Sequence, residues 1–112
     1  ERYYGKKIKK GSTKVIIVDG QVKKISKNMP PEEANAEYVG ISKLSKKAIE
    51  IFYKKIKELI VTGEIKKYPS PSHLFNWLIN NGINIRVIYT DGLLYEEIDY
   101  IEDLESAKLK FT

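Results

Sequence analysis

The sequence predicts a mixed α/β fold, in which short strands and amphipathic helices share one sheet. Three observations predict it. β-Branched apolar runs are separated by two-residue turns, apolar residues recur at helical spacing in other segments, and serine and glycine residues bound those segments. The chain has 112 residues, of which 42% are hydrophobic and 31% are charged, and this is typical of one small globular domain.

The first strands are predicted to form a hairpin. A β-branched run at 14–18 is followed by Asp-Gly at 19–20 and by Gln-Val-Lys-Lys-Ile at 21–25, which contains two further β-branched residues. An Asp-Gly pair between two such runs is a strong signal for a two-residue hairpin. Residues 36–43 are predicted as a third strand, with Gly40 at its middle, where a glycine often marks the close approach of a ligand or another backbone.

Helical periodicity predicts two helices in the middle of the chain and one at its end. Apolar residues recur at helical spacing between Ser45, a predicted cap, and Gly63, a predicted stop. A Ser-Pro pair at 70–71 predicts the start of the second helix, which Gly82 ends. The final helix is predicted at 101–110, with an acidic start and a basic end that complement its macrodipole.

Two more strands are predicted between the last two helices, at 83–89 and 93–98. The predicted elements do not complete a doubly wound sheet, which needs more βα units than this chain offers. Residues 1–13 are polar and basic, and we expect them to form a loosely ordered N-terminal segment. Residues 14–112 are the predicted folded part.

The composition excludes several classes of site. There are no cysteines, so a disulfide framework, a thiol nucleophile and a cysteine-ligated metal are excluded, and a cytoplasmic location is expected. No apolar run is long enough to cross a membrane. The chain begins at Glu1 without a signal-peptide pattern, so we expect a fragment, a processed product or one of two chains.

The net charge is +5, and lysines supply much of the excess. A basic balance is found in proteins that bind nucleic acids, anionic membranes or phosphorylated ligands. The lysines are spread along the chain, however, which favours a solvated lysine-rich surface. No strand shows an RNA-recognition aromatic motif, so nucleic acid is not the expected partner.

Four segments together resemble a known family. Tyr-Glu-Glu-Ile-Asp at 95–99 leads into a helix that carries Glu-Asp-Leu and then Ala at 102–107. Upstream lie a hairpin that ends in a lysine at 22–27, a Glu-Tyr-Val-Gly-Ile strand at 37–41 and a helix at 73–82. In this order, the segments resemble the C-terminal half of a nucleotidyltransferase domain of the sugar-phosphate nucleotidyltransferase and phosphocholine cytidylyltransferase type.

The resemblance covers roughly residues 15–108. It implies a partial Rossmann-like fold, a mixed sheet with flanking helices, and transfer of a nucleoside monophosphate from a nucleoside triphosphate to a phosphorylated acceptor, with release of pyrophosphate. The chain has no β-helix repeats after its last helix, which resembles the short cytidylyltransferases that transfer CMP to phosphocholine. A sugar 1-phosphate acceptor stays open.

The family's first half carries a glycine-rich loop that holds the triphosphate and the first metal-binding aspartate. The seven glycines here are isolated, and none forms a Gly-x-Gly cluster. We therefore expect this chain to be inactive alone and to need the missing N-terminal half as its partner. A homodimer is also open.

Four residues are the predicted site. By resemblance, Asp99 is one of two carboxylates that hold Mg²⁺, although its spacing to Glu102 also fits a helix cap. Lys27 resembles the lysine that contacts a phosphate, with a solvated side chain as the alternative. Glu37 and Gly40 are expected to line the acceptor pocket. No catalytic residue is assigned.

Two other functions stay open on the sequence alone. The chain could be a non-catalytic basic α/β module that binds nucleic acid or another polyanion, in which case its binding would weaken with salt. It could also be an assembly fragment that only pairs with a partner protein.

Overall fold

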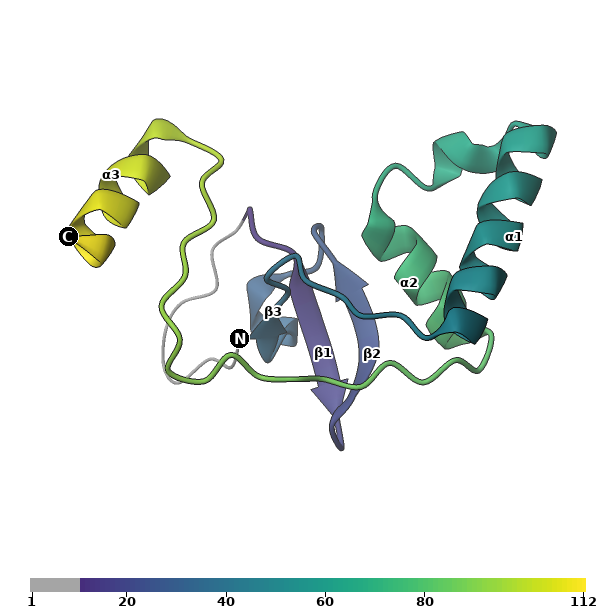
Figure 1. Cartoon of the computed structure of the whole chain (residues 1–112), viewed down its shortest axis with the longest axis horizontal. Helices are drawn as coiled ribbons and strands as arrows, with labels where there is room; N and C mark the ends of the chain where they lie inside the picture. The colour runs from purple at the N-terminus through teal and green to yellow at the C-terminus, as the bar shows by residue number, and fades with distance from the viewer. Residues whose placement is uncertain (1–10) are drawn as a thin grey trace.

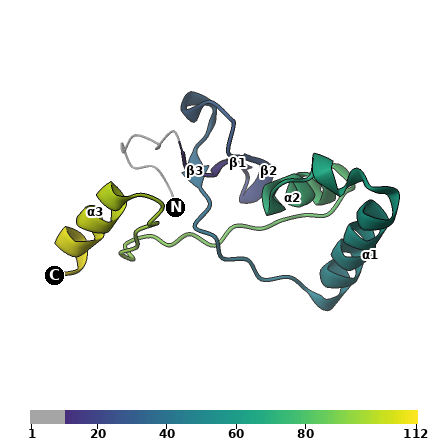
Figure 2. The same cartoon turned by 90° about the horizontal axis from the view of Figure 1, so that it is seen from above.

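Residues 11–112 are described by the computed structural model, which is a mixed α/β structure (Figure 1). Three antiparallel strands form its sheet in the order β2-β1-β3, with β1 at Lys14–Val18, β2 at Gln21–Ser26 and β3 at Ala36–Glu37. Helices α1 and α2 lie to one side of the sheet, and α3 lies at the opposite end of the molecule (Figures 1 and 2). The predicted α/β class is confirmed, since the structure combines strands and helices.

Most of the predicted loose segment at 1–13 lies outside the described residues. The part that is described belongs to the fold. Ser12 is buried, and the carbonyl oxygen of Thr13 accepts a hydrogen bond of 2.9 Å from the backbone N–H of Tyr38.

The predicted hairpin is confirmed. Asp19 and Gly20 connect β1 to β2 with φ angles of 51° and 75°. Positive φ at both central residues is what a type I′ turn requires, and an Asp-Gly pair tolerates it. The register shifts between Ile16 and Ile17, so β2 carries one extra residue at this irregularity.

The two middle helices are also confirmed. Helix α1 runs over Lys46–Thr62; the Ser45 hydroxyl accepts a hydrogen bond from the backbone N–H of Ala48, and Gly63 ends the helix in the left-handed conformation. Helix α2 runs over Pro71–Asn80. Single 3-10 turns at Pro31–Glu33 and Glu64–Lys67 lie between the larger elements.

The start of α2 differs in one detail from the prediction. Ser70 occupies the cap position, but its hydroxyl does not bond to the backbone of the helix. It lies 2.7 Å from the hydroxyl of Ser72 and 2.8 Å from Nδ1 of His73. The only histidine of the chain is therefore engaged at the helix start.

The core forms between one face of the sheet and α2. Its buried side chains come from all three strands and from the helix: Val15, Ile25, Ala36, Phe75 and Leu78. Since side chains alternate along a strand, the residues between these positions lie on the opposite face of the sheet.

Two asparagine side chains form hydrogen bonds with backbone groups of the sheet that have no strand partner. The Asn76 amide oxygen accepts from the N–H of Ile25 at 2.9 Å, and its NH₂ donates to the Ile25 carbonyl at 2.6 Å. Asn35 makes the same pair of bonds to Ile17, at 2.9 and 2.8 Å. Each amide replaces the strand neighbour that these backbone groups would otherwise need.

The later strand predictions are wrong for this structure. The third strand covers only Ala36–Glu37 instead of 36–43, and no strand forms at 83–89 or 93–98. Part of the first of these segments does run along β2, where Gln21 forms an isolated bridge with Arg86. The N–H of Val22 also donates to the carbonyl of Ile85 at 2.9 Å.

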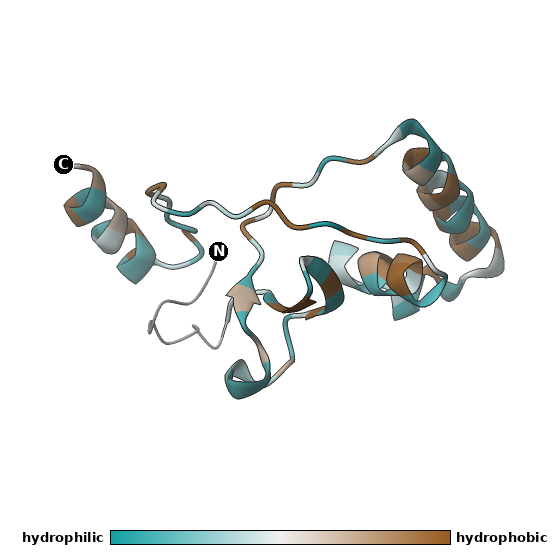
Figure 3. Ribbon diagram, turned by 90° about the horizontal axis from the view of Figure 1, so that it is seen from below, coloured by the Kyte–Doolittle hydropathy of each residue, from teal (hydrophilic) through white to brown (hydrophobic). Residues whose placement is uncertain are grey.

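The segment that follows forms no strand in the described part of the chain, and it leads to α3 at Ile101–Phe111. Its apolar side chains are exposed; Ile88 is 93% exposed and Leu93 is 70% exposed. Figure 3 shows such apolar stretches on extended segments outside the helices. The sequence pattern of a strand is present here, but strand structure also needs a neighbour, and the described residues supply one only near β2. Among these residues, no helix has the length and apolar character needed to cross a membrane.

The structure predicts that Asn76→Ala destabilises the fold more than Asn80→Ala does. The first change leaves the N–H and carbonyl of Ile25 without their amide partner, and we expect a loss of about 1–3 kcal/mol in the free energy of unfolding. Asn80 is exposed on the same helix, so its replacement should change the value by about 0.5 kcal/mol or less. Urea denaturation measures both, and equal values for the two variants would contradict this role of Asn76.

Candidate functional site

The candidate site is built around Lys14, the first residue of the central strand. Lys14 lies opposite Ser26 on β2 and opposite Glu37 on β3. Cross-strand neighbours direct their side chains to the same face of a sheet. Val15, the next residue, belongs to the core, so this polar row lies on the face that the core does not use.

Lys14 is buried, with an exposed fraction of 1%. Its ammonium Nζ donates hydrogen bonds of 2.8 Å to the carbonyl oxygen of Ser12 and 2.8 Å to the carbonyl oxygen of Lys27. A buried charge is tolerated only where hydrogen bonds and an opposite charge compensate for the lost water. Two carbonyl groups and the nearby carboxylate of Glu37 provide this compensation.

Three effects act on the pKa of Lys14. Burial is the largest and lowers the pKa below the ordinary value of a lysine, because it disfavours the charged form. The negative charge of Glu37 raises it, and the positive charge of Lys27 lowers it. The two predicted acceptor residues, Lys27 and Glu37, are therefore both close enough to Lys14 to influence its charge.

Glu37 connects this cluster to a distant part of the chain. The hydroxyl of Tyr95 donates a hydrogen bond of 3.3 Å to Oε2 of Glu37, across 58 residues of sequence. Tyr95 begins the Tyr-Glu-Glu-Ile-Asp run that ends in Asp99. Glu96, which follows it, is bound by Nζ of Lys110 at 2.6 Å, so the run is held both to β3 and to α3.

Lys27 directly follows β2, and Gly40 lies three residues after the end of β3. The side chain of Lys27 is exposed, while its carbonyl group is held by Lys14. Gly40 is exposed in a bend after β3, with φ of 85°. A Cβ at Gly40 would meet no atom of the described residues within 4 Å, so its backbone conformation, and not a close approach within the chain, requires glycine.

Asp99 is exposed and lies just before α3. Its own backbone N–H donates to Oδ2 of Asp103 at 3.1 Å, and the N–H of Tyr100 donates to the same oxygen at 3.0 Å. Tyr100 is the cap residue of the helix. The alternative of a helix cap formed by Asp99 and Glu102 does not occur, because Tyr100 is the cap residue and Asp103 is its reciprocal partner.

The structure does not join all four predicted residues in one contact network. Lys27 and Glu37 lie on either side of Lys14, and Gly40 follows Glu37 by three residues. Within residues 11–112, no hydrogen bond or ion pair connects the Asp99 carboxylate with them. The connection runs through Tyr95, four residues before Asp99.

A metal could use Asp99 only as one ligand among several. The described part of the chain contains no group of three histidine, cysteine, aspartate or glutamate residues that could hold a metal ion. Mg²⁺ in nucleotide sites commonly takes one or two carboxylates and completes its shell with waters and substrate phosphates. An exposed aspartate fits that partial role.

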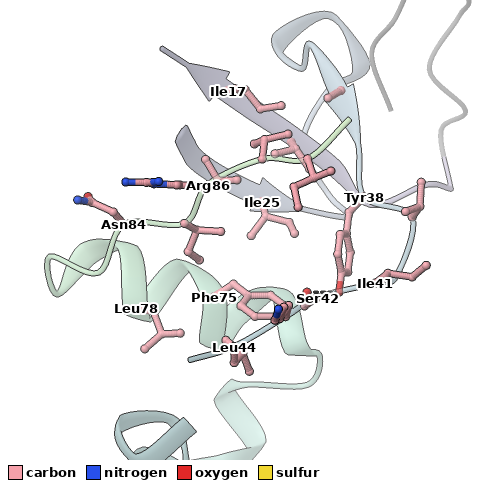
Figure 4. Close-up of a pocket in the computed structure, with 18 of the residues that line it drawn as sticks. Ile17, Ile25, Tyr38, Ile41, Ser42, Leu44, Phe75, Leu78, Asn84 and Arg86 are labelled. Atoms are coloured by element: carbon pink, nitrogen blue, oxygen red, sulfur yellow. Dashed lines mark hydrogen bonds between the residues drawn. The ribbon is translucent and has the colours of Figure 1, made fainter. Parts of the chain in front are cut away.

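A mostly apolar cavity of about 600 Å³ opens on the core face of the sheet. It lies between the strands, the segment after β3, α2 and the segment at 83–90 (Figure 4). Phe75 and Leu78 line it from the helix, and Arg86 lies at its margin near Asn84. The hydroxyl groups of Tyr38 and Ser42 are 2.6 Å apart on the other side.

Lys14 and Tyr95 are members of the site that the sequence pattern did not reveal. Lysine is almost never fully buried unless its charge is paired, so a lysine at the start of a β-branched run suggests an exposed position. Only the pairing of β1 with β3, at Lys14 and Glu37, which are 23 residues apart, shows that this lysine is covered on both sides. No protein-family model, curated protein or solved structure matches the chain.

The first prediction for the site concerns the pKa of Lys14. Glu37→Gln removes the negative charge that favours the ammonium form, so the pKa of Lys14 should fall further below its ordinary value. An NMR titration that follows the side-chain Cε signal of Lys14 measures it. Glu33→Gln, at an exposed position on the 3-10 turn, is the control. An unchanged or raised pKa in Glu37→Gln would contradict the pairing.

The second prediction separates the two roles considered for Asp99. Asp103→Ala should fray the first turn of α3 because it removes the acceptor for the N–H groups of Asp99 and Tyr100, at a cost of about 1 kcal/mol. Asp99→Ala should leave this turn helical. Carbon chemical shifts of residues 101–105 measure both, and fraying in Asp99→Ala of the same size would show that Asp99 is the cap after all.

Proposed function

We propose that this chain is the acceptor-side half of a magnesium-dependent nucleotidyltransferase with a Rossmann-like domain. The complete enzyme transfers a nucleoside monophosphate, CMP being the preferred candidate, from a nucleoside triphosphate to a phosphorylated acceptor such as phosphocholine or a sugar 1-phosphate. One observation carries the proposal. The resemblance assigns Lys27 to an acceptor or nucleotide phosphate and Glu37 to the acceptor pocket. The Lys27 carbonyl and Glu37 both lie next to Lys14, and Tyr95 connects Glu37 to the run that ends in Asp99.

The charges of the cluster suit such an acceptor. The exposed ammonium of Lys27 is a mobile point charge of the kind that binds phosphate. Glu37, half-buried on β3, has the carboxylate that sugar hydroxyl groups or a quaternary ammonium group would need. An acceptor that carries a phosphate at one end and a cation or hydroxyl groups at the other would satisfy both residues.

The reaction proposed is an in-line displacement at the α-phosphorus of the triphosphate. A phosphate oxygen of the acceptor forms the new P–O bond, and the bond to the β-phosphate bridging oxygen breaks, so pyrophosphate leaves with that oxygen. The residues of this chain bind and orient the acceptor. When bound, Mg²⁺ would neutralise charge on the phosphates, with Asp99 as one of its ligands.

The open side of the fold supports a missing half. The segment at 83–90 has the sequence of a strand, contacts β2 along one side, and borders the apolar cavity. Ile41 and Ile88 are 82% and 93% exposed at this margin. A companion polypeptide that adds strands beside this segment would bury these apolar side chains and extend the sheet.

The test is magnesium-dependent pyrophosphate release by the complete natural protein that contains this sequence, measured with cytidine and other nucleoside triphosphates. We expect turnover with phosphocholine or a sugar 1-phosphate, and none by residues 1–112 alone. Asp99→Ala should lower turnover about 100-fold or more, since a metal ligand stabilises the transition state by several kcal/mol. Glu97→Gln, exposed two residues earlier, is the control.

Two results would contradict the proposal. No turnover with any nucleoside triphosphate and acceptor would remove the enzymatic function, and full activity of Asp99→Ala would remove the metal role. A salt-sensitive gel shift with nucleic acid, in the absence of turnover, would favour the alternative of a basic binding module.

A further inference from the structure

The backbone that carries Lys27 is fixed by three features. Its carbonyl oxygen accepts the 2.8 Å hydrogen bond from Nζ of Lys14. The hydroxyl of Ser26, the cross-strand neighbour of Lys14, accepts from the N–H of Asn28 at 3.1 Å. Met29 is buried just beyond. Lys14 provides the only one of these contacts that originates on the central strand.

We propose that Lys14 is a positioning residue, which fixes the backbone of Lys27 so that the Lys27 ammonium and the Glu37 carboxylate face the same bound acceptor. Lys14 is buried and does not contact the acceptor itself. The identity of the ligand in this inference rests on the proposed function. The role of Lys14 in holding the turn at residues 27–28 does not.

The chemistry of Lys14 suits this role better than packing alone. An apolar side chain of similar volume would avoid the cost of burying a charge. Only a long side chain with a terminal donor can reach from β1 to the carbonyl groups of both Ser12 and Lys27. The hydrogen bonds therefore connect three segments of the chain at one nitrogen atom.

The electrostatic surroundings of Lys14 add a consequence for ligand binding. The charged groups that act on it are Glu37 from β3, which raises its pKa, and Lys27 from the turn after β2, which lowers it. Tyr95 donates to Glu37 from the segment before α3. A phosphate bound at Lys27 would place negative charge near both ammonium groups, so binding of an anion should raise the pKa of Lys14.

The test compares Lys14→Met with Lys24→Met in the full chain. Lys24 is exposed on β2, on the sheet face that also carries Lys14, and is the matched control. In Lys14→Met, we expect backbone ¹⁵N order parameters at residues 27–28 to fall from about 0.85 to below about 0.6. The dissociation constant for phosphocholine, or for glucose 1-phosphate in a parallel experiment, should rise about tenfold. Lys24→Met should change neither value.

A third measurement in the wild-type chain tests whether the phosphate binds near Lys14. Addition of saturating phosphocholine should raise the pKa of Lys14 in an NMR titration if the phosphate binds beside Lys27, and an unchanged pKa would contradict that placement. If Lys14→Met does not fold, hydrogen exchange of the Lys14 ammonium group in the wild-type chain tests the role of Lys14 in holding the turn. It should be slower than that of Lys24 by a factor of about ten or more.

The inference is overturned if Lys14→Met folds with unchanged order parameters at 27–28, or if the ammonium hydrogens of Lys14 exchange as fast as those of Lys24. It is also overturned if the acceptor binds equally well to Lys14→Met and to the wild-type chain. Failure of the wild-type chain to bind either acceptor would count against the proposed function, while the order parameters would still decide whether Lys14 holds the turn.

Discussion

The ammonium group of Lys14 is the interaction on which the arrangement of the candidate site depends. It lies at the start of the central strand, where β2 and β3 both pair with β1, and it bonds to the backbone on two sides. The cost of burying this charge is tolerable only while the carbonyl groups and Glu37 stay in place. The carbonyl of Lys27 accepts a hydrogen bond from this buried nitrogen atom, and Glu37, ten residues later in sequence, lies opposite Lys14 on β3.

A second constraint is the small size of the sheet. Three short strands leave backbone groups at their margins that must find other partners. The amides of Asn76 and Asn35 satisfy two of these positions, and the segment near Arg86 satisfies a third. The apolar cavity and the exposed side chains beside it lie next to this segment, at the margin of the sheet. The same open margin that limits the fold is what the proposed companion half would cover.

The sequence was most informative where structure depends on near neighbours. The Asp-Gly turn at 19–20, the Ser45 cap and the Gly63 stop are local signals, and the structure confirms all three. The strands predicted at 83–89 and 93–98 depend on distant partners, and the pattern alone could not show that few partners are present. Lys14 was missed for the same reason, since its burial follows from the pairing of β1 with β3. The function, the Rossmann-like domain and the role of Mg²⁺ stay predictions.

The most direct test of the central claim, that Lys27 and Glu37 form one acceptor site, is an NMR titration of the ¹⁵N-labelled chain with phosphocholine and, separately, with choline and with inorganic phosphate. We predict that phosphocholine shifts the amide signals of Lys27, Asn28, Glu37 and Tyr38 together and saturably. Each half-ligand should shift only part of this set and bind more weakly. Shifts spread over the exposed lysines of α1, or no saturable shift at Lys27 and Glu37, would contradict the account.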